Sequence, residues 1–209
     1  ALVHDSSIFG VASPILGQRY RLEVSPTVGS LKFTGVLADY RRYFMPVRPY
    51  TLAFRLLHYG RYGTGGDDPR IQQLYLGYPT LVRGYDYGSF SASECGTNDG
   101  SCPVYDQLFG SRLAVANAEL RFPPFSALGG RRFYGPLPLE LLVFADAGVA
   151  WTADPKAGFL GGERTAVRSW GAGARVNLFG FAVIEIDYVR PLDRPLKKSL
   201  WQFSFVGGY

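Results

Sequence analysis

Segments of strand length in which apolar and polar residues alternate recur along the chain, and this alternation constrains the fold more than any other feature. In residues 18–24, an apolar face alternates with Arg19, Arg21 and Glu23. A period of two residues is typical of a β-strand with two unlike faces. The same period occurs in residues 31–44, 50–59, 113–122, 139–151, 168–178, 182–188 and 201–205, and more weakly in residues 2–8.

The second face of these segments carries charges of both signs, which distinguishes two classes of β protein. In a soluble sandwich, the apolar face forms the core and the charged face meets water. A transmembrane barrel turns its apolar faces to lipid and its mixed charges to a polar lumen. Short connections (residues 45–49) alternate with long ones (residues 61–112 and 152–167), and aromatic residues lie near segment ends, as in such barrels.

We therefore predict an all-β fold, a transmembrane antiparallel β-barrel with eight membrane strands drawn from nine strand-like segments. At 209 residues, the chain fits one barrel domain over residues 1–209. A secreted soluble barrel with a ligand cavity is the alternative.

Composition excludes several other functions. The net charge of +5 comes without a clustered run of Lys or Arg, so we expect no nucleic-acid partner. No stretch approaches about 18 apolar residues, so we expect no transmembrane helix. His4 and His58 lie in strand-like segments without a recognisable nucleophile or ligand cluster. We expect no catalytic residues, no cofactor and no metal.

The longest connection, residues 61–112, is the most informative part of the chain. It is rich in aromatic residues, namely Tyr75, Tyr78, Tyr85, Tyr87, Phe90, Tyr105 and Phe109. Loops of this length are usually functional or disordered, and so much aromatic area needs a surface to pack against. We expect a long extracellular loop that folds back into the barrel lumen. It also contains Cys95 and Cys102, which predict a disulfide in an oxidising compartment, with two free thiols as the alternative.

By the same alternation, Glu119 and Asp146 both face the lumen on consecutive strands. An arginine carried in on a loop could bridge two carboxylates with its planar guanidinium. On spacing alone, however, these two are equally well separate lumenal charges among many, which include Arg19, Arg21, Glu23, Arg55, Arg121, Arg175, Glu185 and Asp187.

Four stretches carry a family likeness. They are Val82-Arg83-Gly84-Tyr85, residues 117–123, residues 144–151 and the terminal residues 201–209. Together they resemble the C-terminal part of the barrel of the BamA/TamA superfamily, the bacterial surface-antigen type of outer-membrane protein. The resemblance implies a location in the bacterial outer membrane, and a VRGY motif at the tip of a loop that enters the lumen.

The resemblance also implies roles for individual residues. Arg83 would lock the loop inside the barrel, with Asp146 as its first partner and Glu119 as its second. Gly84 would permit close backbone approach, and Tyr85 would pack against the inner wall. The cysteines stand where relatives can carry a loop disulfide. The closing strand, which would serve as a targeting signal, contains Trp201, Phe203, Phe205 and Tyr209.

This sequence departs from the family pattern in two ways. Gly77-Tyr78-Pro79 stands where members usually have a glycine pair, so the loop could bend differently. Full members have sixteen strands and periplasmic POTRA domains, so we interpret this chain as a short form without POTRA domains. Residues 2–8 are then a displaced segment that plugs the barrel, pairs at the seam or adds to a neighbouring chain.

The function implied by the resemblance is assistance in inserting or translocating proteins at the outer membrane. Its partners would be outer-membrane lipids and unfolded outer-membrane proteins. The alternative is a structural or interaction barrel that forms a homodimer through its strand edges, without insertase activity. A third interpretation is that the chain is part of a larger barrel.

Overall fold

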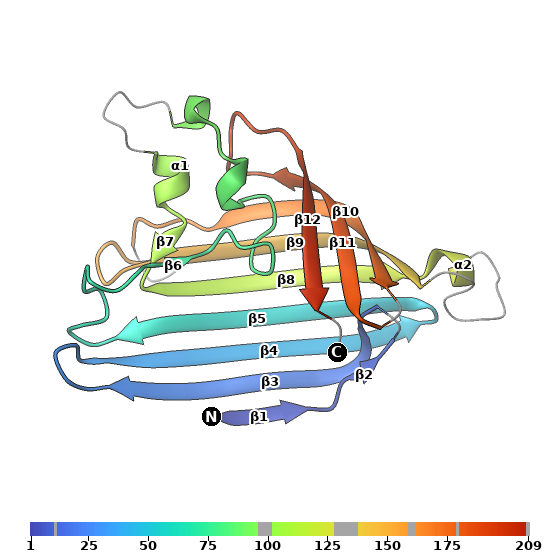
Figure 1. Ribbon diagram of the computed structural model, residues 1–209, viewed down its shortest axis with the longest axis horizontal. Coiled ribbons are helices and arrows are strands. Elements are labelled where there is room, and N and C mark those ends of the chain that lie inside the picture. The colour runs from blue at the N-terminus through green and yellow to red at the C-terminus, as the bar shows by residue number, and fades with distance from the viewer. Residues whose placement is uncertain (11, 96–101, 128–137, 159–161, 179, 208–209) are drawn as a thin grey trace.

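One curved antiparallel β-sheet contains all the long strands (Figure 1). The computed structural model describes residues 1–10, 12–95, 102–127, 138–158, 162–178 and 180–207. The strands of the sheet are β1 (Leu2–Asp5), β2 (Ile8–Phe9), β3 (Pro14–Thr27), β4 (Phe33–Val47), β5 (Tyr50–Tyr62), β8 (Arg112–Phe122), β9 (Leu139–Trp151), β10 (Val167–Leu178), β11 (Ala182–Pro191) and β12 (Leu200–Gly207). They pair in the order β1-β3-β4-β5-β8-β9-β10-β11-β12, and β2 pairs with β3.

The predicted all-β, antiparallel fold class is confirmed, and the eight predicted long strands are β3 to β5 and β8 to β12. Closure of this sheet into a barrel is not seen among the described residues. The ninth segment, β1, pairs with β3 from Leu2 opposite Leu22 to Asp5 opposite Arg19. Residues 2–5 therefore lie at an edge of the sheet, one of the three placements considered for this segment. Among the described residues, no pairing joins β12 to β1 or β3, so the sheet has two separate edges.

Strand β3 is longer than its sequence pattern predicts. Pairing with β4 continues from Gly17 opposite Tyr43 to Thr27 opposite Phe33, so Pro26 lies within the strand. Proline is tolerated on edge strands, where no partner needs its missing N–H. Because β1 reaches only as far as Leu22, the Pro26 part of β3 is such an edge.

The two faces of the sheet differ as predicted from the charge pattern. The face away from the insertion, called here the outer face, exposes large apolar side chains such as Leu22, Val24, Phe54, Leu56, Trp170, Trp201, Phe203 and Phe205. The opposite, inner face buries polar and charged side chains, among them Arg121, Glu140, Asp146, Arg175, Glu185, Asp187 and Gln202. This is the reverse of a water-soluble protein and fits an outer face that meets lipid.

The insertion between β5 and β8 folds against the inner face. It contains a short hairpin of β6 (Leu74–Tyr75) with β7 (Phe109–Gly110) and the helical turns η1 (Tyr87–Ser89), η2 (Ala92–Glu94) and α1 (Pro103–Asp106). Its buried residues Leu76, Val82, Tyr85 and Leu108 pack with the sheet residues Leu57, Leu113, Val115, Ala150 and Val167. The insertion therefore has a hydrophobic core that it shares with the sheet.

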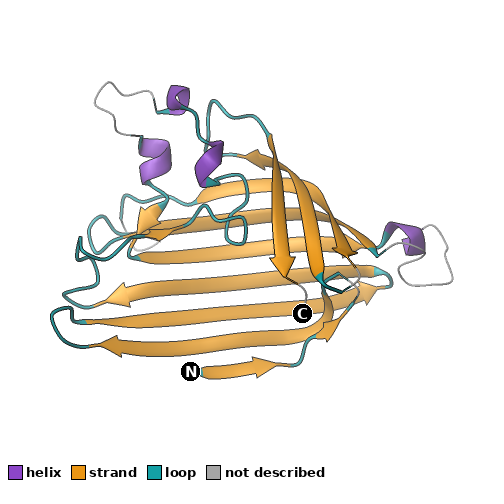
Figure 2. Ribbon diagram, viewed as in Figure 1, coloured by secondary structure: helices purple, strands orange, loops and turns teal. Residues whose placement is uncertain are grey.

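In the part of the chain that the structure describes, helices are confined to short turns in the connections (Figure 2). Besides those of the insertion, the structure describes α2 (Pro124–Ala127) after β8. No helix in the described ranges is long and apolar enough to span a membrane.

If lipid covers the outer face, a charge placed there must destabilise the protein. Leu56, on β5, is 61% exposed. We expect Leu56→Arg to lower the free energy of unfolding in lipid vesicles by about 2–4 kcal/mol. Val28→Arg, at the 87%-exposed Val28 in the turn after β3, should change it by less than about 0.5 kcal/mol. Urea titration of both variants makes the comparison, and equal, small effects would contradict the assignment of the outer face.

Candidate functional site

The tip of the insertion is a tight turn that projects Arg83 into the inner face. The amides of Leu81 and Val82 both donate to the carbonyl of Tyr78, which reverses the chain just before the motif. Gly84 has φ of +87°, a conformation that other residues rarely adopt. A Cβ atom at Gly84 would also lie 2.8 Å from Cγ1 of Val189. Glycine is therefore required here both by the backbone and by the close approach to β11.

Arg83 is surrounded by carboxylates from three strands. Its Nε lies 2.8 Å from Oδ2 of Asp146 and its Nη2 lies 2.9 Å from Oδ1, a two-pronged contact with β9. Nη2 also lies 2.8 Å from Oε1 of Glu119 on β8, and Nη1 lies 3.2 Å from Oε1 of Glu185 on β11. The guanidinium carbon lies 3.5 Å from the centre of the Phe144 ring. Only 6% of the Arg83 side chain is exposed, so these contacts replace its hydration.

Both predicted partners, Asp146 and Glu119, are thus in contact with Arg83. The sequence analysis did not connect Glu185 or Asp187 with Arg83, yet Glu185 contacts it directly and Asp187 lies 3.9 Å away. Alternation alone could place these residues on the inner face of β11. It could not show how far the sheet curves to bring β11 opposite β8.

Arg83 belongs to a network with an excess of negative charge. The other cations are Arg175, which contacts Glu185 at 2.7 Å and Glu119 at 3.0 Å, and Arg121, which contacts Glu119 at 2.7 Å. The carboxylates of the network are Glu119, Glu140, Asp146, Glu185 and Asp187. Without Arg83, two guanidiniums would face this whole set of largely buried carboxylates. Loss of one partner from a buried ion pair is strongly destabilising.

Gly84 and Tyr85 connect the motif to the last strands. The Gly84 amide donates to Oε1 of Gln202 on β12 at 2.9 Å. Tyr85 is fully buried, and its hydroxyl donates to the carbonyl of Arg168 on β10 at 2.8 Å. The same hydroxyl accepts from the Asp193 amide at 3.2 Å. Burial raises the pKa of Tyr85 to about 12, so it remains a neutral donor at physiological pH.

A second arginine, Arg194, contacts the insertion from outside it, and the sequence analysis missed this residue. It lies in the connection between β11 and β12, and its side chain is fully buried. It donates to both carboxylate oxygens of Glu94 at 2.8 and 2.9 Å and to the Gly84 carbonyl at 2.8 Å. It also bonds Ser89 and stacks 3.8 Å from the centre of the Phe90 ring. No periodic pattern covers a connection, so neither alternation nor a motif marks Arg194 in the sequence.

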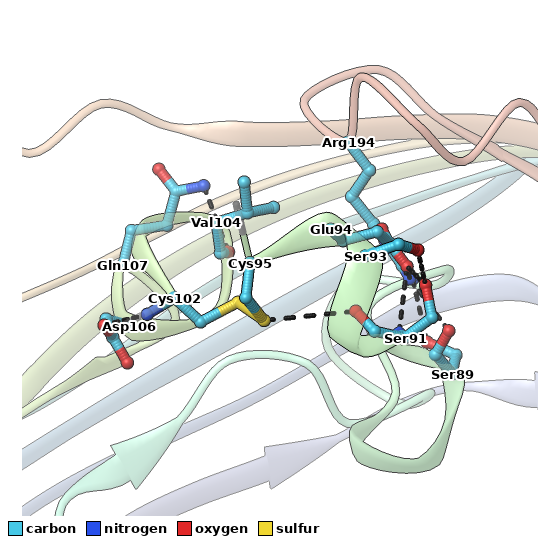
Figure 3. The surroundings of a disulfide bond; sticks show 10 residues. All are labelled: Ser89, Ser91, Ser93, Glu94, Cys95, Cys102, Val104, Asp106, Gln107 and Arg194. Atoms are coloured by element: carbon cyan, nitrogen blue, oxygen red, sulfur yellow. Dashed lines mark hydrogen bonds and ion pairs between the residues drawn. A yellow bond between two sulfur atoms is a disulfide. The ribbon is translucent and has the colours of Figure 1, made fainter. Parts of the chain in front are cut away.

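The acceptor Glu94 is itself held in place by local structure (Figure 3). It ends η2 in a capping box, in which its carboxylate accepts from the Ser91 amide at 3.1 Å. The next residue, Cys95, is bonded to Cys102, which confirms the predicted disulfide. The hydrogen bonds from Arg194 hold the pKa of the Glu94 carboxyl below its usual value.

The remaining predicted residues lie apart from this network. Trp201, Phe203 and Phe205 alternate on the outer face of β12 and are at least 64% exposed. Tyr209 lies outside the described residues. Within the described ranges, no cluster of His, Cys, Asp or Glu side chains is arranged to hold a metal ion.

Removal of the central guanidinium should cost substantial stability. We expect Arg83→Ala to lower the free energy of unfolding by about 3–5 kcal/mol, because it leaves buried carboxylates without their cation. Arg83→Lys should recover part of this, since an ammonium keeps the charge without the planar fork. Arg70→Ala removes an arginine that is 63% exposed and should leave the urea midpoint unchanged. Equal urea midpoints for wild type and Arg83→Ala would refute this assignment.

The contact of Arg194 with Glu94 should depend on pH. Because the pKa of the Glu94 carboxyl is lowered, the contribution of this contact to stability is complete above about pH 4.5. It is lost as the pH falls through the lowered pKa. We therefore expect proteolytic cleavage of residues 86–95 to rise on acidification below this value. Glu94→Gln should make cleavage high at neutral pH and reduce its dependence on pH. If the wild type and Glu94→Gln show the same dependence of cleavage on pH, Glu94 is excluded as the titrating group.

Comparisons with known proteins agree with this architecture. No curated protein matches the sequence. Among solved structures, the chain is similar to BamA from Haemophilus ducreyi lacking POTRA domains 1–3, with a TM-score of 0.68 and 19% identity. The match covers 99% of this chain and 41% of that chain, so this chain spans about two-fifths of the BamA structure. Residues 9–209 match the Omp85 superfamily domain. The chain therefore belongs to the Omp85 superfamily of the bacterial outer membrane.

Proposed function

We propose that this chain helps other proteins to insert into or cross the outer membrane, without enzymatic activity. Membership of a superfamily concerned with assembly and translocation at the outer membrane supports the general class. In this proposal, the inserted loop is locked against the inner face by Arg83. The partners are outer-membrane lipids and unfolded outer-membrane proteins.

One observation carries the proposal, namely that the loop tip touches the strand at the edge of the sheet. Gly84 donates to Gln202 on β12, and Arg194 reaches the Gly84 carbonyl from the connection that leads into β12. Strand β12 pairs with β11 alone among the described strands. A change in the loop tip would therefore directly alter the contacts of β12, the strand with a free edge.

The edge strand is also suited to disturb the surrounding bilayer. β12 spans eight residues, whereas β3 and β4 span 14 and 15. A tilted transmembrane strand needs about 9–11 residues to cross the hydrocarbon core. Within the described residues, β12 and its partner β11, which spans ten residues, are shorter than the strands at the other end of the sheet. This favours local thinning of the bilayer next to β11 and β12. Either a weakly held seam or such thinning would lower the barrier for a protein that inserts there.

The test is the folding of an unfolded outer-membrane barrel in liposomes that contain the purified protein. We expect the wild type to accelerate folding and Arg83→Ala to lose the acceleration, with Arg70→Ala as the matched control that retains it. Equal acceleration by wild type and Arg83→Ala would leave only generic perturbation of the bilayer. A folded wild type without any acceleration would contradict the proposed function.

A further inference from the structure

The two edges of the described sheet carry backbone groups without a strand partner, and the proposed function does not account for them. Among the described residues, β12 lacks a partner on one side, and β3 lacks one beyond Leu22. In the hydrocarbon core, each unpaired backbone group costs several kcal/mol, so open edges are not tolerated there. Some strand must pair with each edge once the outer face lies in lipid.

Strand direction identifies the compatible edges. In a sheet whose neighbours are all antiparallel, every second strand runs the same way. With nine strands in the order β1-β3-β4-β5-β8-β9-β10-β11-β12, the two ends β1 and β12 are parallel to each other. Strand β3 runs opposite to β12. An antiparallel closure therefore joins β12 to β3, and β1 must first leave.

Strand β1 is poorly attached to the edge that it covers. It pairs through Leu2, Val3, His4 and Asp5, against 14 residues in β3. Leu2 and Val3 are both 58% exposed, and the Asp5 contact with Arg19 is 3.6 Å long between exposed side chains. Ser6, which follows β1, donates to the Gln18 carbonyl, and β2 continues the pairing only at Ile8 and Phe9. These short exposed segments can be displaced by a longer strand. They act as a temporary cover for the β3 edge.

Closure within one chain conflicts with the packing of the inner face. The interior of an eight-stranded barrel is just wide enough for its own side chains. Here the inner face also carries the shared core with Leu76, Val82, Tyr85 and Leu108 of the insertion, and beside it a cavity of about 470 Å³. A ring of only the eight long strands would have to expel the insertion together with Arg83. A ring that keeps the insertion on the inner face therefore needs more strands than these eight.

We propose that the further strands come from a second copy of the chain, with β12 of each copy pairing with β3 of the other after β1 leaves. Two sets of eight long strands then close a ring with two-fold symmetry, which leaves no edge. The side chains at the seam are compatible. Leu22 and Val24 on β3 and Phe203 and Phe205 on β12 continue one apolar outer band.

Site-directed disulfide cross-linking in lipid vesicles tests the pairing, without any client protein. Cysteines are placed on the outer face as Leu22→Cys with Phe203→Cys, and as Val24→Cys with Phe203→Cys to allow for register. Oxidation should give a covalent dimer. The matched control, Leu56→Cys with Phe203→Cys, uses a central strand and should give none. Cross-linking within one chain would overturn the proposal. The absence of cross-linking in a protein that has the mass of one chain would overturn it as well.

A second variant tests the displacement of β1. The rings of His4 and Tyr20 are stacked at 5.1 Å between centroids, so His4→Cys with Tyr20→Cys can fix β1 on β3 by a disulfide. The oxidised variant should have the mass of one chain in detergent, and reduction should restore the dimer. An oxidised variant that still dimerises would refute the β3 edge as the interface. Neither result depends on whether the protein assists insertion, so the two proposals can fail separately.

Discussion

The contact of Arg83 with the carboxylates of β8, β9 and β11 is the interaction on which the rest of the structure depends. The inner face carries Glu119, Asp146, Glu185 and Asp187 close together, and such a set repels itself strongly when little water is present. One guanidinium with several donors reduces that repulsion from the centre of the group. Because this cation lies in the insertion, the sheet and the insertion are stable only together.

Two arginines connect the insertion, the sheet and the β11–β12 connection. Arg83 extends from the insertion to the sheet, and Arg194 extends from the β11–β12 connection back to the insertion. Gly84 lies between them, because its amide bonds β12 and its carbonyl accepts from Arg194. The position of β12 is thus tied to the loop tip at two points. Any movement of β12 away from the loop tip must break contacts of the motif.

Alternation in the sequence predicted which residues share a face, but not how far apart they lie. It placed Glu119 and Asp146 on the inner face, and the family likeness supplied Arg83 as their partner. It could not include Glu185 in the same contact, because the curvature of the sheet brings β11 towards β8. Arg194 lies in a connection, where neither period nor motif marks a buried charge. Strand β3 extends beyond the predicted residues 18–24 and includes Pro26, because the edge of a sheet tolerates a proline that an interior strand does not.

Hydrogen exchange at the motif tests most directly whether the carboxylate contact holds the insertion on the sheet. The Gly84 amide is bonded to Gln202 and should be strongly protected in the wild type. Asp146→Asn keeps the shape of the side chain and removes its charge. The account predicts that this variant loses protection at Leu81–Tyr85 while the amides of β9 stay protected. Unchanged protection of Gly84 in Asp146→Asn would contradict the central role of the Arg83 contact.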